Sequence, residues 1–217
     1  MTTIKNLNNK INYSNRKKLN NDFSNRDLRR SNCYNSDFSG SNFDNTSLRG
    51  AQFKSCTFNE CTFEYTEFVA TNLKKSRFKN VKFKNTIFDS VNLEGVDFEG
   101  SEFENVIFVS CDLSKALNLN LSETVKIFEE MPKLDISKEL KRAVKIAMRN
   151  EYIKAARVLD TKNGTTSPIS MMILLEKFDK ETVIKGLNIL SQNLNEQFCT
   201  LSYIIKSLET YKTEGIL

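Results

Sequence analysis

AQFKSCTFNECTFEY, residues 51–65, consists of three five-residue units, each with a Phe at its third position. The same register continues without interruption from Phe23 to Leu113 and contains nineteen units. Their third positions hold 13 Phe, 5 Leu and 1 Cys, so this lane contains 13 of the chain's 16 Phe residues. Two residues before each centre, from Ser31 to Cys111, the chain has only Ser, Thr, Ala, Val or Cys. Large and small inward positions therefore alternate along the chain.

A period of five residues fits neither an α-helix nor a continuous β-strand. Residues two apart share one face of an extended strand, but the next position of the same parity is polar, as at Asn35, Gly40 and Asn45. The chain must turn there, so each unit is a very short strand followed by a corner. The pattern predicts a solenoid with a corner in every unit.

The number of corners in each coil follows from the separation at which the central residues match. Phe/Phe or Leu/Leu identity holds for 12 of 15 pairs that lie four units apart, against 8 of 16 pairs at three units and 8 of 14 at five units. Four units therefore form one square coil, and nineteen units form about five coils. At the usual spacing between strands, the rod would be roughly 23 Å long.

The motif of a small residue, a polar residue, Phe or Leu, and two polar residues resembles the pentapeptide-repeat family. Thr71–Lys75 and Val91–Gly95 are examples. The resemblance covers about 95 of the 217 residues and implies a right-handed quadrilateral β-helix. The fold class that we expect is thus a β-solenoid followed by an all-α domain.

Three regions follow from these patterns. Residues 1–20 are expected to be an N-terminal cap or a disordered arm, and residues 21–115 the β-helix. From Ala116 the chain leaves the repeat register, so residues 116–217 are expected to be a helical domain with a bundle or coiled-coil arrangement.

Within the helical region, Ser137 and Ser167-Pro168 are suitable helix starts, and Asn163-Gly164 is a suitable end. A long amphipathic helix is expected before Asn163, and a second helix from Pro168 to Phe178. Asp179 can cap a last helix whose apolar residues recur at spacings of four and three, over about 30 residues or roughly 45 Å. This seam predicts homo-oligomerisation, with an intramolecular four-helix bundle as the alternative. Its residues are Leu187, Leu190, Leu194, Gln197, Leu201, Ile204 and Leu208.

Composition argues against catalysis. The chain has no His, so Ser–His and Cys–His nucleophiles and His-containing metal sites are excluded. Cys33, Cys56, Cys61 and Cys111 occupy inward repeat positions and are expected to pack in the core. No Gly-rich phosphate loop is present. We expect no catalytic, cofactor-binding or metal-binding residues, no cofactor and no enzyme activity.

No stretch of the sequence is long and apolar enough to span a membrane, and the N-terminus lacks an apolar signal segment. No membrane association is therefore expected, and a cytoplasmic protein is the default expectation.

Charged residues form bands along the repeats. Residues 1–20 carry a net charge of +5, residues 21–115 carry −2 and residues 116–217 carry +2. A basic band at 74–84 precedes an acidic band at 94–104, and opposite charges lie four units apart, which is one coil. The spacing predicts ion pairs between adjacent coils, and the alternative is a basic or acidic stripe that faces nucleic acid. The predicted pairs are Lys74/Glu94, Arg77/Asp97, Lys79/Glu99, Lys82/Glu102 and Lys84/Glu104.

One face of the rod differs from the rest. Val69, Ile87, Ile107 and Val109 are outward positions beside Phe68, Phe88 and Phe108. They predict an apolar patch, which normally marks a contact. Either the segment Leu121–Phe128 folds back onto it, or it is a docking face for a protein partner.

These features favour a non-enzymatic interaction scaffold, with the rod as a docking surface and the helical domain as an oligomerisation or partner-binding module. The alternative comes from Qnr-type and mycobacterial members of the resembled family, which protect or inhibit DNA gyrase by resembling duplex DNA. The rod's net charge of −2 and its basic band depart from that type. Direct nucleic-acid binding is not expected, because outward aromatic residues that could stack on bases are nearly absent. The protein partner is not identified by the sequence.

Overall fold

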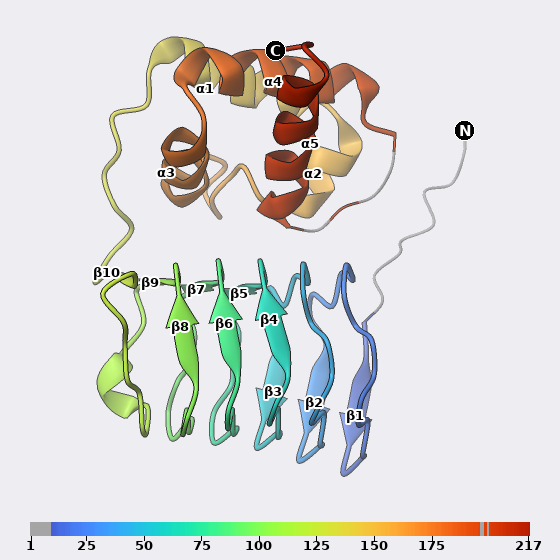
Figure 1. Cartoon of the computed structure of the whole chain (residues 1–217), viewed down its shortest axis with the longest axis vertical. Coiled ribbons are helices and arrows are strands. Elements are labelled where there is room, and N and C mark those ends of the chain that lie inside the picture. The colour runs from blue at the N-terminus through green and yellow to red at the C-terminus, as the bar shows by residue number, and fades with distance from the viewer. Residues whose placement is uncertain (1–9, 196–197, 199) are drawn as a thin grey trace. The chain divides into compact units, whose positions relative to one another are not determined.

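The structure is a computed structural model that describes residues 10–195, 198 and 200–217. The chain divides into two compact units, Met1–Glu130 and Met131–Leu217. The first unit is a β-solenoid of about six turns, and the second consists of α-helices (Figure 1).

The solenoid is built from very short strands, each of which pairs in parallel with the strand one coil further along the chain. Tyr13 pairs with Cys33, and Phe63 pairs with Phe83. The strands form three sheets, in the orders β1-β2-β3, β4-β6-β8 and β10-β9-β7-β5, and single bridges connect the coils on the fourth side. Four units per coil are therefore confirmed. The strands are β1 (Asn12–Ser14), β2 (Asn32–Tyr34), β3 (Gln52–Lys54), β4 (Thr62–Glu64), β5 (Glu67–Val69), β6 (Lys82–Lys84), β7 (Ile87–Asp89), β8 (Glu102–Glu104), β9 (Ile107–Val109) and β10 (Lys126–Phe128).

Every corner of the coil uses the left-handed backbone region. The fifth-residue positions from Asn15 to Ser110 have φ between 47° and 70°, including Gly40 and Gly50. Asn and Gly adopt this conformation at lower cost than other residues, which explains why they are frequent at the predicted turns. The corners were recognisable in the sequence for this reason.

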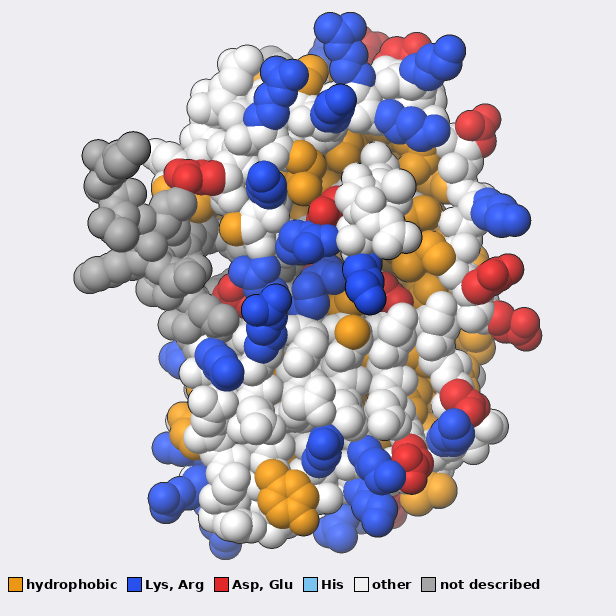
Figure 2. Space-filling view, turned by 180° about the vertical axis from the view of Figure 1, so that it is seen from behind, with side chains coloured by type: hydrophobic (Ala, Val, Ile, Leu, Met, Phe, Trp, Pro, Cys, Tyr) orange, Lys and Arg blue, Asp and Glu red, His pale blue; other side chains and the backbone are white. Residues whose placement is uncertain are grey.

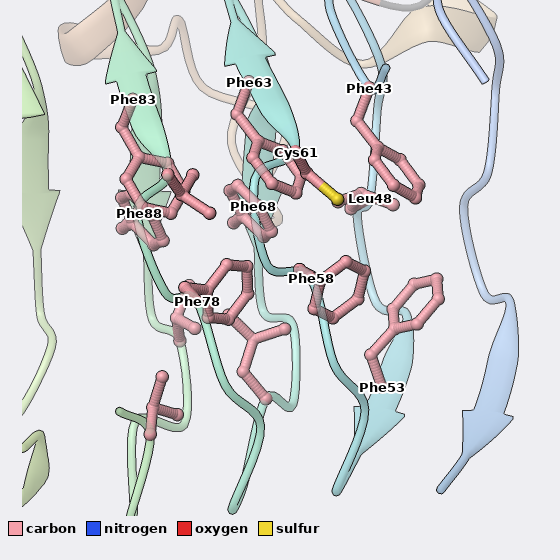
Figure 3. Packing of buried hydrophobic residues seen from close by; sticks show 14 of the residues in the cluster. Phe43, Leu48, Phe53, Phe58, Cys61, Phe63, Phe68, Phe78, Phe83 and Phe88 are labelled. Carbon is pink, nitrogen blue, oxygen red and sulfur yellow. The ribbon is translucent and has the colours of Figure 1, made fainter. Parts of the chain in front are cut away.

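Phe side chains fill the interior in stacks that run along the rod. Phe43 lies on Phe63 with ring centroids 5.1 Å apart, and Phe63 lies on Phe83 at 5.3 Å (Figure 3). All three rings are fully buried. Neighbouring stacks meet edge to face, as Phe58 and Phe43 do at 72°. Offset stacking and edge-to-face packing are both favourable for aromatic rings. Phe can therefore pack favourably both within a stack and against the neighbouring stacks.

The small inward positions connect the coils through hydroxyl groups. The hydroxyl of Thr66 donates to the carbonyl of Phe43 at 2.7 Å, and that of Thr86 donates to the carbonyl of Phe63 at 2.7 Å. Ser76 donates in the same way to Phe53, and it accepts from the Cys56 N–H at 3.0 Å. Ser and Thr therefore fit the small position and also satisfy backbone groups inside the rod.

The solenoid is longer at both ends than the expected five coils from residue 21 to residue 115. At its start, β1 lies within residues 1–20, for which we expect a cap or a disordered arm; the structure describes only residues 10–20 of that segment. Tyr13 and Lys18 occupy central positions there, and the Lys18 ammonium lies 4.8 Å from the centroid of the Tyr13 ring. At the other end, β10 lies beyond residue 115 and pairs with β9 after a return that is one position shorter than a full coil. Neither of these end coils has Phe or Leu at every fifth position. The repeat pattern therefore did not predict them.

The helical unit contains five helices: α1 (Lys138–Ala147), α2 (Glu151–Ala156), α3 (Pro168–Lys177), α4 (Lys180–Asn193) and α5 (Leu201–Thr213). The side chains of Ser137, Ser167 and Asp179 cap α1, α3 and α4 as their positions in the sequence predict. Pro168 is in the first turn of α3. Helix α4 contacts α1, α3 and α5 and is the centre of the unit.

Two of the expected long helices are each divided. The segment before Asn163 forms α1 and α2 because Asn150 caps a new helix, accepting hydrogen bonds from the N–H groups of Tyr152 and Ile153. The same Asn150 side chain donates to the carbonyl of Leu194 at 2.9 Å, just after α4 ends. The expected last helix is also divided, into α4 and α5, so the prediction of one continuous helix there is wrong.

Candidate protein-interaction surfaces

The predicted apolar patch lies on the outer face of the sheet β10-β9-β7-β5. Its residues occupy two rows that run along the rod on either side of the column Phe68, Phe88 and Phe108. Ile87 and Ile107 are neighbours in the first row. In the second row, Asp89 separates Val69 from Val109. The patch is therefore interrupted by one carboxylate.

Strand β10 extends this face. The segment Leu121–Phe128, whose folding over the patch was one of the two alternatives, pairs through β10 with the edge of β9, so that Lys126 lies beside Ile107 and Phe128 beside Val109. Phe128 thus adds an aromatic side chain to the second row. Sequence reasoning missed this residue, because β10 is outside the repeat register.

The four predicted residues differ in their exposure. Ile107 and Val109 are buried, with 6% and 0% of their surface exposed, whereas Val69 and Ile87 are half-buried. The part of the patch that is open to solvent is therefore its β5–β7 end.

The ion pairs between coils are largely present. Lys74 lies 2.8 Å from Glu94, Lys79 lies 3.2 Å from Glu99, and Lys84 lies 3.7 Å from Glu104. Two of the predicted pairs differ. Lys82 contacts Glu104 at 3.4 Å instead of Glu102. Asp97 is the bridge partner of Arg77 but accepts a hydrogen bond from Asn118 at 2.7 Å.

These pairs neutralise the two charged bands locally. The Lys74 ammonium, which donates a hydrogen bond to Glu94, holds the pKa of that carboxyl below its usual value. Figure 2 shows that Lys, Arg, Asp and Glu side chains are interspersed on the face of the molecule that it presents. The structure favours mutual neutralisation over a stripe of one sign.

The four cysteines of the repeats occupy the interior of the rod as predicted. Cys33, Cys56 and Cys61 are buried, and Cys111 is partly buried. Burial raises the pKa of Cys33 to about 11 and those of Cys56 and Cys61 to about 12. They are therefore protonated and poorly nucleophilic near neutral pH. Among the described residues, no cluster of three or more Cys, Asp or Glu side chains is arranged to hold a metal ion.

The predicted oligomerisation residues are buried. Leu187, Ile204 and Leu208 are fully covered, and Leu190, Leu194 and Leu201 are at most 7% exposed. Gln197 lies outside the described residues. Helices α4 and α5 contact each other, as the intramolecular alternative requires. Self-association through these residues stays a prediction, which light scattering of the purified chain would test.

None of the helices in the described part of the chain is long and apolar enough to cross a membrane.

Comparison with known proteins identifies the repeats. The family model "Pentapeptide repeat region" matches residues 32–108 and 51–127. No curated protein matches the chain. Solved structures with similar folds include QnrB1, described as a plasmid-mediated fluoroquinolone resistance protein. It is 18% identical, with 56% of this chain and 87% of QnrB1 covered and a TM-score of 0.34.

Two cyanobacterial structures are also similar. Rfr23 from Cyanothece 51142 is 14% identical, with 54% of this chain and 88% of Rfr23 covered and a TM-score of 0.37. HetL from Nostoc sp. strain PCC 7120 is involved in the regulation of heterocyst differentiation. It is 16% identical, with 51% of this chain and 49% of HetL covered and a TM-score of 0.32.

Proposed function

The repeat region of this chain belongs to the pentapeptide-repeat family, and on this premise we propose that the protein is a non-enzymatic protein-interaction scaffold. The solenoid is a rigid platform, because backbone hydrogen bonds and Phe stacks fix each coil on the next. Its outward side chains therefore stand in straight rows at the spacing of parallel strands. A partner would meet a surface that is already ordered, which lowers the entropic cost of binding.

The observation that carries this proposal is the apolar face of the sheet β10-β9-β7-β5. The other outward rows of the rod are mainly polar or charged, whereas this face presents Val69 and Ile87 at the surface. Apolar groups on an otherwise polar surface favour a contact in which they lose water. We propose that the half-buried Val69 and Ile87 make that contact, and that the buried Ile107 and Val109 support them from the adjacent coil.

Site-specific photo-crosslinking would test the proposal. A photoreactive amino acid is placed at Val69 or Ile87, and as a control at the exposed Asn92 on another side of the rod. The scaffold function predicts a discrete crosslinked protein from the first two positions and none from Asn92. A crosslink only within the chain would show that the face is covered by the protein itself. Absence of any crosslink at Val69 and Ile87 would contradict the proposal.

DNA mimicry directed at gyrase is the alternative, because acidic residues gather in the later coils, at Glu94, Asp97 and Glu99 for example. Lys74 and Lys79 pair with two of these carboxylates, which weakens the negative surface that a DNA mimic needs. A supercoiling assay titrated with the protein separates the two functions. Inhibition of gyrase, or its protection from fluoroquinolone, would favour DNA mimicry. The absence of both effects would favour the scaffold function.

A further inference from the structure

The helical unit contains a groove that the apolar face of the rod does not involve. Its volume is about 780 Å³, and its walls are the segment 132–136, helix α1 and the hairpin at 159–168. Ile136, Val144 and Leu159 line it with buried side chains, and Leu134 and Met148 line it with more exposed ones. The size and the mainly apolar lining are those of a binding groove.

The hairpin is a defined wall. Asp160 and Thr166 form an antiparallel bridge, and the Thr161 N–H donates to the Thr165 carbonyl at 2.8 Å. Asp160 is the acidic residue of the lining, and its carboxylate accepts a hydrogen bond from Arg157 at 2.8 Å. The Arg157 guanidinium therefore already neutralises the Asp160 carboxylate.

Three lysines line the groove without such a partner. Lys141 and Lys145 are one turn apart on the exposed side of α1, and Lys133 lies on the opposite wall. Within the described residues, none of the three ammonium groups forms an ion pair. The groove thus combines an apolar floor with an excess of positive charge.

We propose that this groove binds an acidic peptide segment of a partner protein. An apolar side chain of the segment lies on the floor formed by Val144, Met148 and Leu159, and flanking carboxylates face Lys141 and Lys145. Charge complementarity selects an acidic segment over a basic one. No aromatic side chain lines the groove, so the bases of a single-stranded nucleic acid would find no stacking surface. This site is separate from the apolar face of the rod, and either can fail without the other.

Fluorescence anisotropy with the full chain tests the proposal. The probe is a fluorescein-labelled peptide made of Leu, Ala and Glu, and the comparison peptide has Lys in place of every Glu. We expect the Glu peptide to bind and the Lys peptide not to bind. Higher salt should weaken the binding, because the lysines are exposed.

Matched variants locate the site. The double variant Lys141→Glu, Lys145→Glu should weaken binding of the Glu peptide by about tenfold or more, since attraction becomes repulsion. The control Lys154→Glu, Lys177→Glu makes the same change of charge on exposed residues outside the groove and should leave binding unchanged. Leu134→Gln, at an exposed position of the lining, should also weaken binding, and circular dichroism establishes that each variant is folded.

Three results would overturn the proposal: no binding of the Glu peptide at high micromolar concentration, equal binding of the Lys peptide, or an equal loss in the control variant. None of these would alter the result of crosslinking at Val69, so failure of the groove and failure of the scaffold function are distinguishable.

Discussion

The ring of Phe63 stacks on that of Phe83 with centroids 5.3 Å apart, although the two residues are one full coil apart in the chain. Phe103 continues the stack beyond Phe83 at 5.1 Å. The side chain of Phe83 therefore lies between two stacked rings, and it also contacts the tilted ring of Phe78 and packs edge to face with Phe88.

Replacing Phe83 by Ala should lower the free energy of unfolding by about 3–5 kcal/mol, because it leaves a cavity in the middle of the rod. Phe83→Leu keeps the position apolar and should lower the free energy of unfolding by less than Phe83→Ala does. Urea unfolding followed by circular dichroism measures both. An unchanged midpoint for Phe83→Ala would contradict the assignment of this lane to the core.

The buried hydroxyl of Thr66 gives a second prediction. Thr66→Val keeps the shape of the side chain but removes the donor to the carbonyl of Phe43, and should cost about 1–3 kcal/mol of stability. Thr57→Val is the control, because Thr57 is an outward, partly exposed position and its change should stay within about 0.5 kcal/mol. Equal effects of the two substitutions on urea unfolding would show that the internal hydroxyl is unimportant.

The left-handed corners predict that the stability of the rod depends on which residue occupies each corner. Asn85 has φ of 50°, so Asn85→Val should destabilise the rod by about 1–2 kcal/mol or more. Asn85→Gly should be tolerated, since Gly adopts positive φ without a steric penalty. The melting temperatures of the two variants decide this, and a more stable Val variant would exclude the left-handed corner.

The pair Lys74–Glu94 predicts a dependence on pH. The pKa of Glu94 is lowered in the folded protein, chiefly by the hydrogen bond from Lys74 and by its charge. The pair therefore stabilises the fold above the ordinary Glu value of 4.5, and this contribution is lost as the pH falls through the lowered pKa. Lys74→Ala should raise the pKa of Glu94, as NMR titration would measure. The control is Lys54→Ala. Lys54 lies one coil before Lys74 in the same row, so its replacement should leave the pKa of Glu94 unchanged.

Thiol reactivity tests the packing of the cysteines. Cys33, Cys56 and Cys61 should resist iodoacetamide in the folded protein at pH 8, because burial raises their pKa values to between about 11 and about 12. In urea they should react fully. Mass spectrometry of the digested protein identifies each site, and rapid modification of Cys61 before unfolding would show that the interior is open.

The solenoid could be predicted almost completely from local sequence. Its inward positions, its corners and its four-unit coil are each repeated many times, so a single mismatch such as Cys33 does not hide the pattern. Three of the five ion pairs followed from the same period. The end coils could not be predicted, because Lys18 and the shortened return to β10 depart from the repeat.

Local sequence is sufficient to predict those parts of the protein in which each residue interacts with others at a fixed separation along the chain. It therefore specified the coil, the Phe stacks and the helix starts at Ser137, Ser167 and Asp179. The remaining features depend on contacts between segments that are distant in the chain. Asn150 divides one helix while its side chain binds the carbonyl of Leu194, far along the chain, and β10 pairs with β9 without a repeat motif. The groove beside Lys141 and Lys145 likewise arises from three segments whose proximity has no periodic signature.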